Sequence, residues 1–281
     1  MVCYTPAMER TTPHAPLTSK ENKAVRYLVS LSDPKVRKKE KAFLVEGIKM
    51  VEEALRDKLG VKQVIAAPSL TQHHGKGLIK LSERSGIEIL WISERLLASL
   101  SDSKTPQPVM AVVGMREHSE EALLANGSGL IVIAHQLQDP GNLGTIIRTA
   151  EAVGASGIAV TPHTVDAYNG KAIRGSMGSI MRVPVVRVQN ERDFAARCKE
   201  RGFQTVALEL NGRKTPFELD LTRPTVIMLG QESSGLTAEE LVDFDHRVRI
   251  PMAETIDSLN VATSAAVFLY EAMRQRMKRQ D

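Results

Sequence analysis

Short apolar runs alternate with amphipathic segments through the second half of the chain, and this pattern limits the possible folds most. The runs are GLIVIAH (129–135), GIAVT (157–161), VPVVRV (183–188), FQTVALEL (203–210), VIML (226–229) and RVRI (247–250). Helix-like segments separate most of them. Strands joined through helices pair in parallel, since a crossover must return the chain to the same edge of the sheet. We therefore predict a mostly parallel-sheet α/β domain.

The first half repeats the alternation on a smaller scale. Its predicted strands are AFLVEG (42–47), VKQVIAA (61–67), IEILWIS (87–93) and PVMAVVG (108–114), and its predicted helices cover 19–31, 48–59, 70–85 and 94–100. The polar segment 116–128 separates the two halves. We predict a disordered lead-in at 1–16, a smaller α/β/α domain at 17–115, a linker at 116–128 and the larger domain at 129–281.

Composition excludes several classes of protein. The chain has 281 residues, 42% of them apolar, which is enough for two cores. Its two cysteines, Cys3 and Cys198, cannot form a disulfide framework and suit a reducing cytosol, so we expect a cytoplasmic protein. No apolar run approaches the ~20 residues that a membrane span needs. His73 and His74 lack a third ligand, so no metal is expected.

Positive charge is concentrated near the N-terminus in a chain whose pI is near 9.0. Such a cluster favours a polyanionic partner, because lysines and arginines on phosphates release condensed counterions. A solvated helix face explains it equally well. The candidates for contact with such a polyanion are Lys20, Lys23, Arg26, Arg37, Lys38 and Lys39.

Two strand ends and a helix start come together in the segment Thr225–Met273. Ligands of open α/β sheets bind outside the carboxyl ends of the strands. We therefore predict a small-molecule pocket there, with Pro251 ending the last strand and Asn260 opening the helix. Its expected lining is Leu229, Gly230, Ile250, Pro251, Met252, Ser258, Leu259 and Asn260. Thr237 and Glu240 form a predicted capping box, and Glu232 lies outside it.

A second polar site follows the strand 129–135, in QDPGNLGTIIRTAEAVGA. Asn142 is expected to cap the helix, and Arg148 lies away from the centre of its apolar face. Together they suit an anion or phosphate contact, although an ordinary cap and a surface arginine fit as well. Neither a Gly-x-Gly-x-x-Gly fingerprint nor a P-loop is present, which disfavours nicotinamide and ATP chemistry.

Three of these stretches resemble the ordered signature motifs of the SpoU/TrmH branch of the SPOUT RNA methyltransferases. They are DPGNLGTIIRTAEAVGA, VIMLGQESSGL and RIPMAETIDSLNVATSAAVFLYE. Residues 19–114 are similar to the L30e-like substrate-binding domain that precedes many such enzymes. The resemblance implies a deep trefoil knot in the C-terminal domain, a bent S-adenosylmethionine in its pocket, and an active site formed across a homodimer.

The resemblance also implies residue roles. Cofactor contacts would come from Leu208, Leu229, Gly230, Ile250, Pro251, Met252, Ser258 and Leu259, and the polar active-site positions are Asn142, Arg148, Glu232, Ser258 and Asn260. Arg148 would also hold RNA. The implied reaction is methylation of a ribose 2′-hydroxyl, with ribosomal RNA favoured over transfer RNA by analogy of architecture. Transfer RNA methylation and a noncatalytic RNA-binding assembly factor stay open as alternatives.

Overall fold

The computed structural model describes residues 12–72, 75–125, 129–231 and 235–277. The chain divides into two compact units. The first comprises the chain up to Arg116 together with Tyr168–Met181, and the second comprises Glu117–Ala167 and the chain from Arg182 onward. Within the described residues, no helix is both long and apolar enough to cross a membrane.

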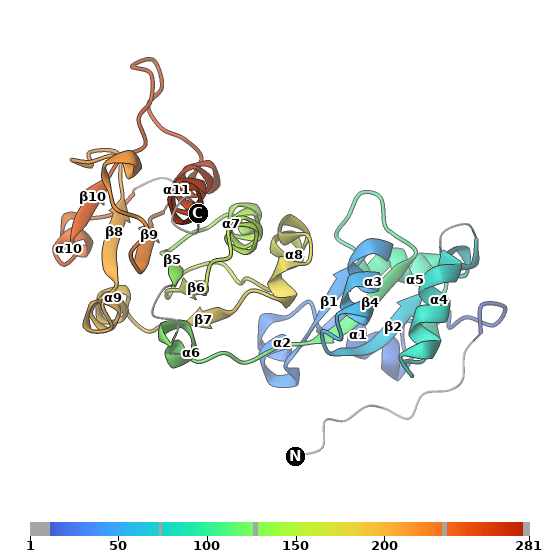
Figure 1. The fold of residues 1–281 in the computed structure, drawn as a ribbon. Helices are drawn as coiled ribbons and strands as arrows, with labels where there is room; N and C mark the ends of the chain where they lie inside the picture. The colour runs from blue at the N-terminus through green and yellow to red at the C-terminus, as the bar shows by residue number, and fades with distance from the viewer. Residues whose placement is uncertain (1–11, 73–74, 126–128, 232–234, 278–281) are drawn as a thin grey trace. The chain divides into compact units, whose positions relative to one another are not determined.

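The first unit is a four-stranded mixed sheet with helices around it (Figure 1). Its strands run in the order β1-β4-β2-β3, with β4 antiparallel to both neighbours and β3 parallel to β2. Its strands are β1 (Ala42–Glu46), β2 (Val61–Ala66), β3 (Ile89–Trp91) and β4 (Val109–Gly114). Its helices are α1 (Lys23–Ser30), α2 (Pro34–Glu40), α3 (Ile48–Arg56), the 3₁₀ turn η1 (Pro68–Thr71), α4 (Gly75–Arg84), α5 (Glu94–Leu100), α8 (Gly170–Ser176) and the turn η2 (Ser179–Met181).

Local capping explains where the first two helices begin. Helix α1 starts later than predicted, because the Asn22 side chain accepts the Ala24 N–H and acts as its N-cap. The charged run after it, for which we predicted no element, forms α2. There Asp33 accepts the Lys35 N–H and Pro34 occupies the first turn, where its missing N–H costs nothing.

The second unit is a six-stranded sheet in which every pair of neighbouring strands is parallel, as predicted. The strand order is β10-β8-β9-β5-β6-β7. Its strands are β5 (Leu130–Ala134), β6 (Gly157–Val160), β7 (Val185–Arg187), β8 (Gln204–Leu208), β9 (Thr225–Leu229) and β10 (His246–Val248). Its helices are α6 (Glu120–Leu124), α7 (Pro140–Ala152), α9 (Glu191–Glu200), the 3₁₀ turn η3 (Pro216–Glu218), α10 (Ala238–Leu241) and α11 (Val261–Met277).

The central strands of this sheet are covered on both faces. Every residue of β5 and β9 is buried, as expected for parallel strands between helical layers. Figure 1 shows α7 and α11 side by side, and the two helices pack against each other. The segment 116–128 contributes α6, whose Leu123 and Leu124 belong to the core of this unit.

Two boundaries near the predicted sites differ from expectation. Strand β10 ends at Val248, so Ile250 lies beyond the strand and Pro251 does not end it. Helix α7 begins earlier, at Pro140, and its N-cap is Asp139, whose Oδ1 accepts the Asn142 N–H at 3.0 Å. Asn142 is therefore inside the first turn, which leaves its side chain for another contact.

Candidate active site

A cavity of about 500 Å³ lies at the carboxyl ends of β8 and β9, as predicted for an open parallel sheet. Three chain segments line it. They contribute Leu208, Glu209, Leu210 and Asn211; Leu229, Gly230, Gln231, Gly235 and Leu236; and Ile250, Met252, Asp257, Ser258, Leu259, Asn260, Val261 and Ser264. All the residues that we predicted to line the pocket do line it, except Pro251, which is exposed to solvent.

Gly230, the first residue after β9, lines the cavity. A Cβ at this position would lie 2.7 Å from Cδ2 and Cγ of Leu236 and 2.9 Å from the carbonyl carbon of Gly235. The returning segment at Gly235 and Leu236 thus packs directly on the Gly230 backbone. Only glycine allows this approach, and the arrangement leaves backbone groups at the edge of the cavity.

The polar side of the cavity joins two segments that are distant in sequence. The Asn260 amide nitrogen donates to Oδ1 of Asn142 across 2.9 Å. Oδ1 of Asn260 accepts the Ala262 and Thr263 N–H groups at 2.9 and 3.3 Å, which caps α11 as predicted. Asn142 and Asn260, which we predicted as site residues on separate motifs, therefore meet beside the pocket.

Arg148 is not part of this lining. It is exposed on α7, six residues beyond Asn142, which places it roughly 240° around the helix axis at about 100° per residue. The two side chains consequently leave α7 in different directions. Within the described residues, neither side chain lines the cavity, but Asn142 accepts a hydrogen bond from the lining residue Asn260.

The sequence reasoning missed the segment directly after β8. Glu209, Leu210 and Asn211 line the cavity, and the Glu209 carboxylate, only 9% exposed, accepts a 2.5 Å hydrogen bond from Nε of Arg247. The strand-end rule that located Leu229 applies equally to β8 and would have identified them. Glu232, another predicted site residue, lies outside the described residues, as do His73 and His74.

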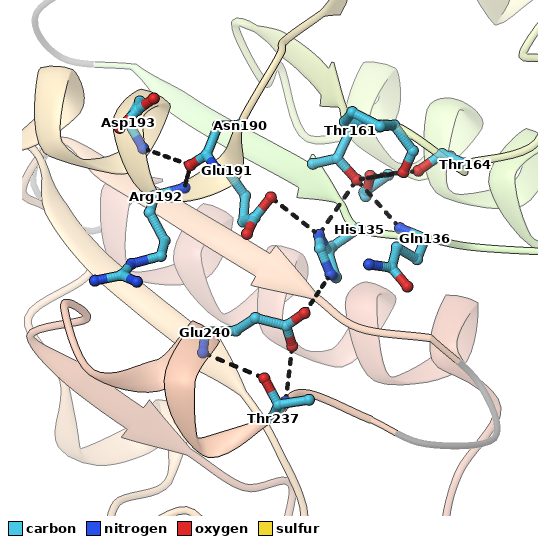
Figure 2. Close-up of polar contacts among 12 residues, drawn as sticks. His135, Gln136, Thr161, Thr164, Asn190, Glu191, Arg192, Asp193, Thr237 and Glu240 are labelled. Atoms are coloured by element: carbon cyan, nitrogen blue, oxygen red, sulfur yellow. Dashed lines mark hydrogen bonds and ion pairs between the residues drawn. The ribbon is translucent and has the colours of Figure 1, made fainter.

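A buried histidine occupies the same edge of the sheet (Figure 2). His135 follows β5; its Nε2 lies 2.9 Å from Oε1 of Glu240, and its Nδ1 lies 3.6 Å from Oε2 of Glu191. Burial alone would raise the pKa of Glu240, but hydrogen bonds from Thr237 and the neighbouring His135 hold it below its ordinary value. Among the described residues, His135, Glu191 and Glu240 also form a group whose ligand-type atoms all lie within 4.8 Å.

Residues 129–270 match the SpoU rRNA methylase family. The chain belongs to this family. Residues 22–111 match the MRM3-like substrate-binding domain, so the two units are a substrate-binding unit and a SpoU unit. The SpoU fold implies the trefoil knot that the resemblance led us to expect.

Relatives cover nearly the whole length of the chain. The 23S rRNA (guanosine(2553)-2′-O)-methyltransferase RlmP of Bacillus subtilis is 32% identical over 90% of this chain and 97% of its own. The 23S rRNA (uridine(2479)-2′-O)-methyltransferase of Streptomyces viridochromogenes is 30% identical over 96% and 95%. The structure of an rRNA methyltransferase from Sinorhizobium meliloti with bound AdoMet matches with a TM-score of 0.78 and 31% identity, covering 92% and 97%.

The basic residues of the substrate-binding unit separate into two groups. Lys20, Lys23, Arg26, Lys38 and Lys39 are exposed. The predicted polyanion contact of Arg37 is wrong, because this residue is only 5% exposed. Its guanidinium donates to the carbonyl oxygens of Leu31 and Ser32 at 2.9 and 2.7 Å, so it fixes the turn between α1 and α2.

Proposed function

We propose that this chain transfers a methyl group from S-adenosylmethionine to a ribose 2′-hydroxyl of ribosomal RNA. The observation that supports it best is the cavity beyond β8 and β9, which has an apolar lining and whose lining residue Asn260 donates a hydrogen bond to Asn142. Two relatives that span almost the full chain are named as 23S rRNA 2′-O-methyltransferases. The architecture with a substrate-binding unit suits the same substrate class.

The cavity fits the cofactor in size and in chemistry. We expect Leu208, Leu229, Gly230, Ile250, Met252, Ser258 and Leu259, all of which line the cavity, to hold S-adenosylmethionine. When bound, this cofactor supplies a methyl group already activated on a sulfonium. The remaining task for the protein is alignment, and orientation of reactants can supply ~7–11 kcal/mol of a barrier.

Polar side chains beside the cavity are suited to that alignment. Asn142, Ser258 and Asn260 offer amide and hydroxyl groups that can hold the ribose, and Glu232 completes the proposed set. A guanidinium keeps its proton in proteins, so we assign Arg148 the role of a cation that holds an RNA phosphate or orients the 2′-hydroxyl. Lys20, Lys23, Arg26, Lys38 and Lys39 are the proposed phosphate contacts of the substrate-binding unit.

The position of Arg148 supports a homodimer as the active form. Because it does not line the pocket of its own chain, we propose that it serves the pocket of a second copy. The loop around that pocket exposes Ile256 (49%) and Leu259 (37%), apolar side chains that a second copy would cover. We expect this dimer to act in the cytoplasm.

The direct test is transfer of a radiolabelled methyl group from S-adenosylmethionine to purified RNA. Ribosomal RNA from cells that lack the gene should accept label, and the modified nucleotide should resist alkaline hydrolysis at its 3′ side. Label in transfer RNA alone would favour the first alternative. No label in any RNA, with RNA binding intact, would favour the noncatalytic assembly factor.

A mixing experiment tests the shared site. At S-adenosylmethionine concentrations near the wild-type Kd, Arg148→Ala and Gly230→Ala chains are each expected to lose most of their activity as homodimers. Co-expression of the two should restore activity, because a heterodimer then has one intact pocket that faces one intact Arg148. If the mixture stays inactive although heterodimers form, Arg148 serves its own chain.

A further inference from the structure

The His135 side chain contacts Thr161, Glu191 and Glu240, and Glu240 in turn bonds to Thr237 (Figure 2). The His135 backbone N–H donates to the carbonyl oxygen of Leu229 at 2.9 Å, at the end of β9. Its side chain, 4% exposed, reaches Oε1 of Glu240 on α10. Both contacts are made to the segments that flank Gly230 and Leu236.

Glu240 also bonds to Thr237, which lies next to the edge of the pocket. Its second carboxylate oxygen accepts the Thr237 N–H at 2.7 Å, and the Thr237 hydroxyl accepts the Glu240 N–H at 3.3 Å. This is the capping box predicted from the sequence. The residue before Thr237 is Leu236, which lines the cavity and packs on Gly230.

The direction of the central hydrogen bond does not depend on the charge of the histidine. An ionised carboxylate only accepts, so Nε2–H of His135 must donate to Glu240. On the other side of the ring, Nδ1 lies 3.2 Å from the Thr161 hydroxyl, which can act as donor or acceptor. The Glu191 carboxylate, at the start of α9, faces the same nitrogen.

We propose that His135 is a positioning residue for S-adenosylmethionine: through Glu240 it fixes Gly235–Thr237, the segment that packs on Gly230 and closes one side of the pocket. This inference rests on the proposed function, because it assumes that this pocket takes the cofactor. Glu191 has a different role, because its contact joins the His135 ring to α9 and not to the segment at the pocket.

The geometry of the amide side chains gives a matched pair of variants. The nitrogen of a glutamine reaches about as far as Nε2 of histidine, whereas that of an asparagine reaches only as far as Nδ1. His135→Gln can therefore keep the donor to Glu240, and His135→Asn loses it. Glu240→Gln replaces one of the two carboxylate oxygens that accept from His135 and Thr237. Glu191→Gln is the control that leaves the Glu240 contacts in place.

The experiment measures the Kd for S-adenosylmethionine by calorimetry on the full-length protein, together with KM and kcat for methyl transfer. His135→Asn and Glu240→Gln should each weaken cofactor binding about tenfold, which corresponds to about 1.4 kcal/mol. Their kcat at saturating cofactor and their affinity for RNA should change less than about twofold. His135→Gln and Glu191→Gln should bind the cofactor within about twofold of wild type. Thermal melting of each variant shows whether it is folded, and Glu240→Gln stands in for His135→Asn if that variant does not fold.

Three results would overturn the proposal. The first is equal cofactor affinity in wild type, His135→Asn and Glu240→Gln. The second is an equal loss in Glu191→Gln, which would indicate general loosening of this region. The third is a stoichiometric metal ion in the purified wild type that is lost in His135→Gln, which would make the cluster a metal site. If the wild type itself binds no S-adenosylmethionine, the proposed function fails as well, and this separates the two failures.

Discussion

The Asn260 side chain donates to that of Asn142 across 2.9 Å, although 118 residues separate them in the chain. The contact joins the first turn of α7 to the start of α11. Because Asn260 also caps α11 through its other amide atom, one side chain both starts a helix and links two of the sequence motifs. The bond therefore couples the packing of α7 and α11 to the polar side of the pocket.

Substitution of Asn260 can separate these two roles. Asn260→Ser keeps a capping oxygen but cannot reach Asn142, so we expect a loss of stability below about 0.5 kcal/mol and a methyl-transfer rate about tenfold lower. Asn260→Ala also loses the cap, which should cost about 1 kcal/mol in addition. Urea unfolding and single-turnover transfer measure the two effects. A serine variant with the full rate would show that the amide contact has no role in the reaction.

Arg148→Ala should reduce turnover without loss of stability. The side chain is exposed, so the free energy of unfolding should change by less than about 0.5 kcal/mol. Loss of a charged orienting group should lower kcat about 10²–10³-fold. Arg201→Ala, at an exposed arginine after α9, is the matched control and should keep its activity. Equal activity of the two variants would argue against a role for Arg148.

Gly230→Ala should impair cofactor binding more than folding. The new methyl group would meet Leu236 at 2.7 Å and the Gly235 backbone at 2.9 Å, so the edge of the pocket must shift. We expect the Kd for S-adenosylmethionine to rise at least tenfold. Gly77→Ala in α4 is the control: its Cβ would meet only Glu52 at 3.9 Å, and alanine should stabilise the helix by about 0.5–1 kcal/mol. Unchanged cofactor affinity in Gly230→Ala would contradict this account of the pocket.

Cys198 should resist thiol reagents in the folded protein. Burial in the core raises the pKa of its thiol to about 12, and the side chain is fully covered. The thiolate that reacts is therefore scarce at pH 8. In a Cys3→Ser variant, which leaves Cys198 as the only thiol, labelling should be slow in buffer and rapid in denaturant. Fast labelling of the folded variant would show that α9 opens easily.

Asp245 should contribute a pH-dependent part of the stability. Burial would raise the pKa of its carboxyl, but hydrogen bonds from Lys199 and Thr205 hold it below the ordinary 3.8. A depressed folded pKa means that this contribution is present above the unfolded pKa and is lost as pH falls through the folded one. Because the Asp245 carboxylate is 38% exposed and solvent screens its contacts, Asp245→Asn should be less stable than wild type by less than about 1 kcal/mol at pH 7, with a difference that shrinks below pH of about 3.8. Urea unfolding of the two proteins at pH 7 and at a pH below about 3.8 measures the difference in stability. A difference that is the same at the two pH values would contradict the prediction.

Much of the fold follows from local patterns. The parallel sheet was predicted correctly from the alternation of strand-like and helix-like segments. The capping box of Thr237 and Glu240 and the cap at Asn260 were predicted correctly because each depends on residues within a few positions of one another. The pocket could also be predicted from the strand-end rule. The N-cap of α7 was wrong because Asp139 and Asn142 are both good caps, and only the backbone geometry of the turn decides between them.

The sequence by itself determined the periodicities, the helix caps and the resemblance to the SpoU family, since these are properties of short segments. Tertiary structure decided which distant side chains meet: Asn142 with Asn260, and His135 with Glu240. The knot belongs to the same class, and general rules of chain connection would have rejected it. The physical reason is that apolar periodicity shows which face of a segment is buried but carries no information about which other segment covers it.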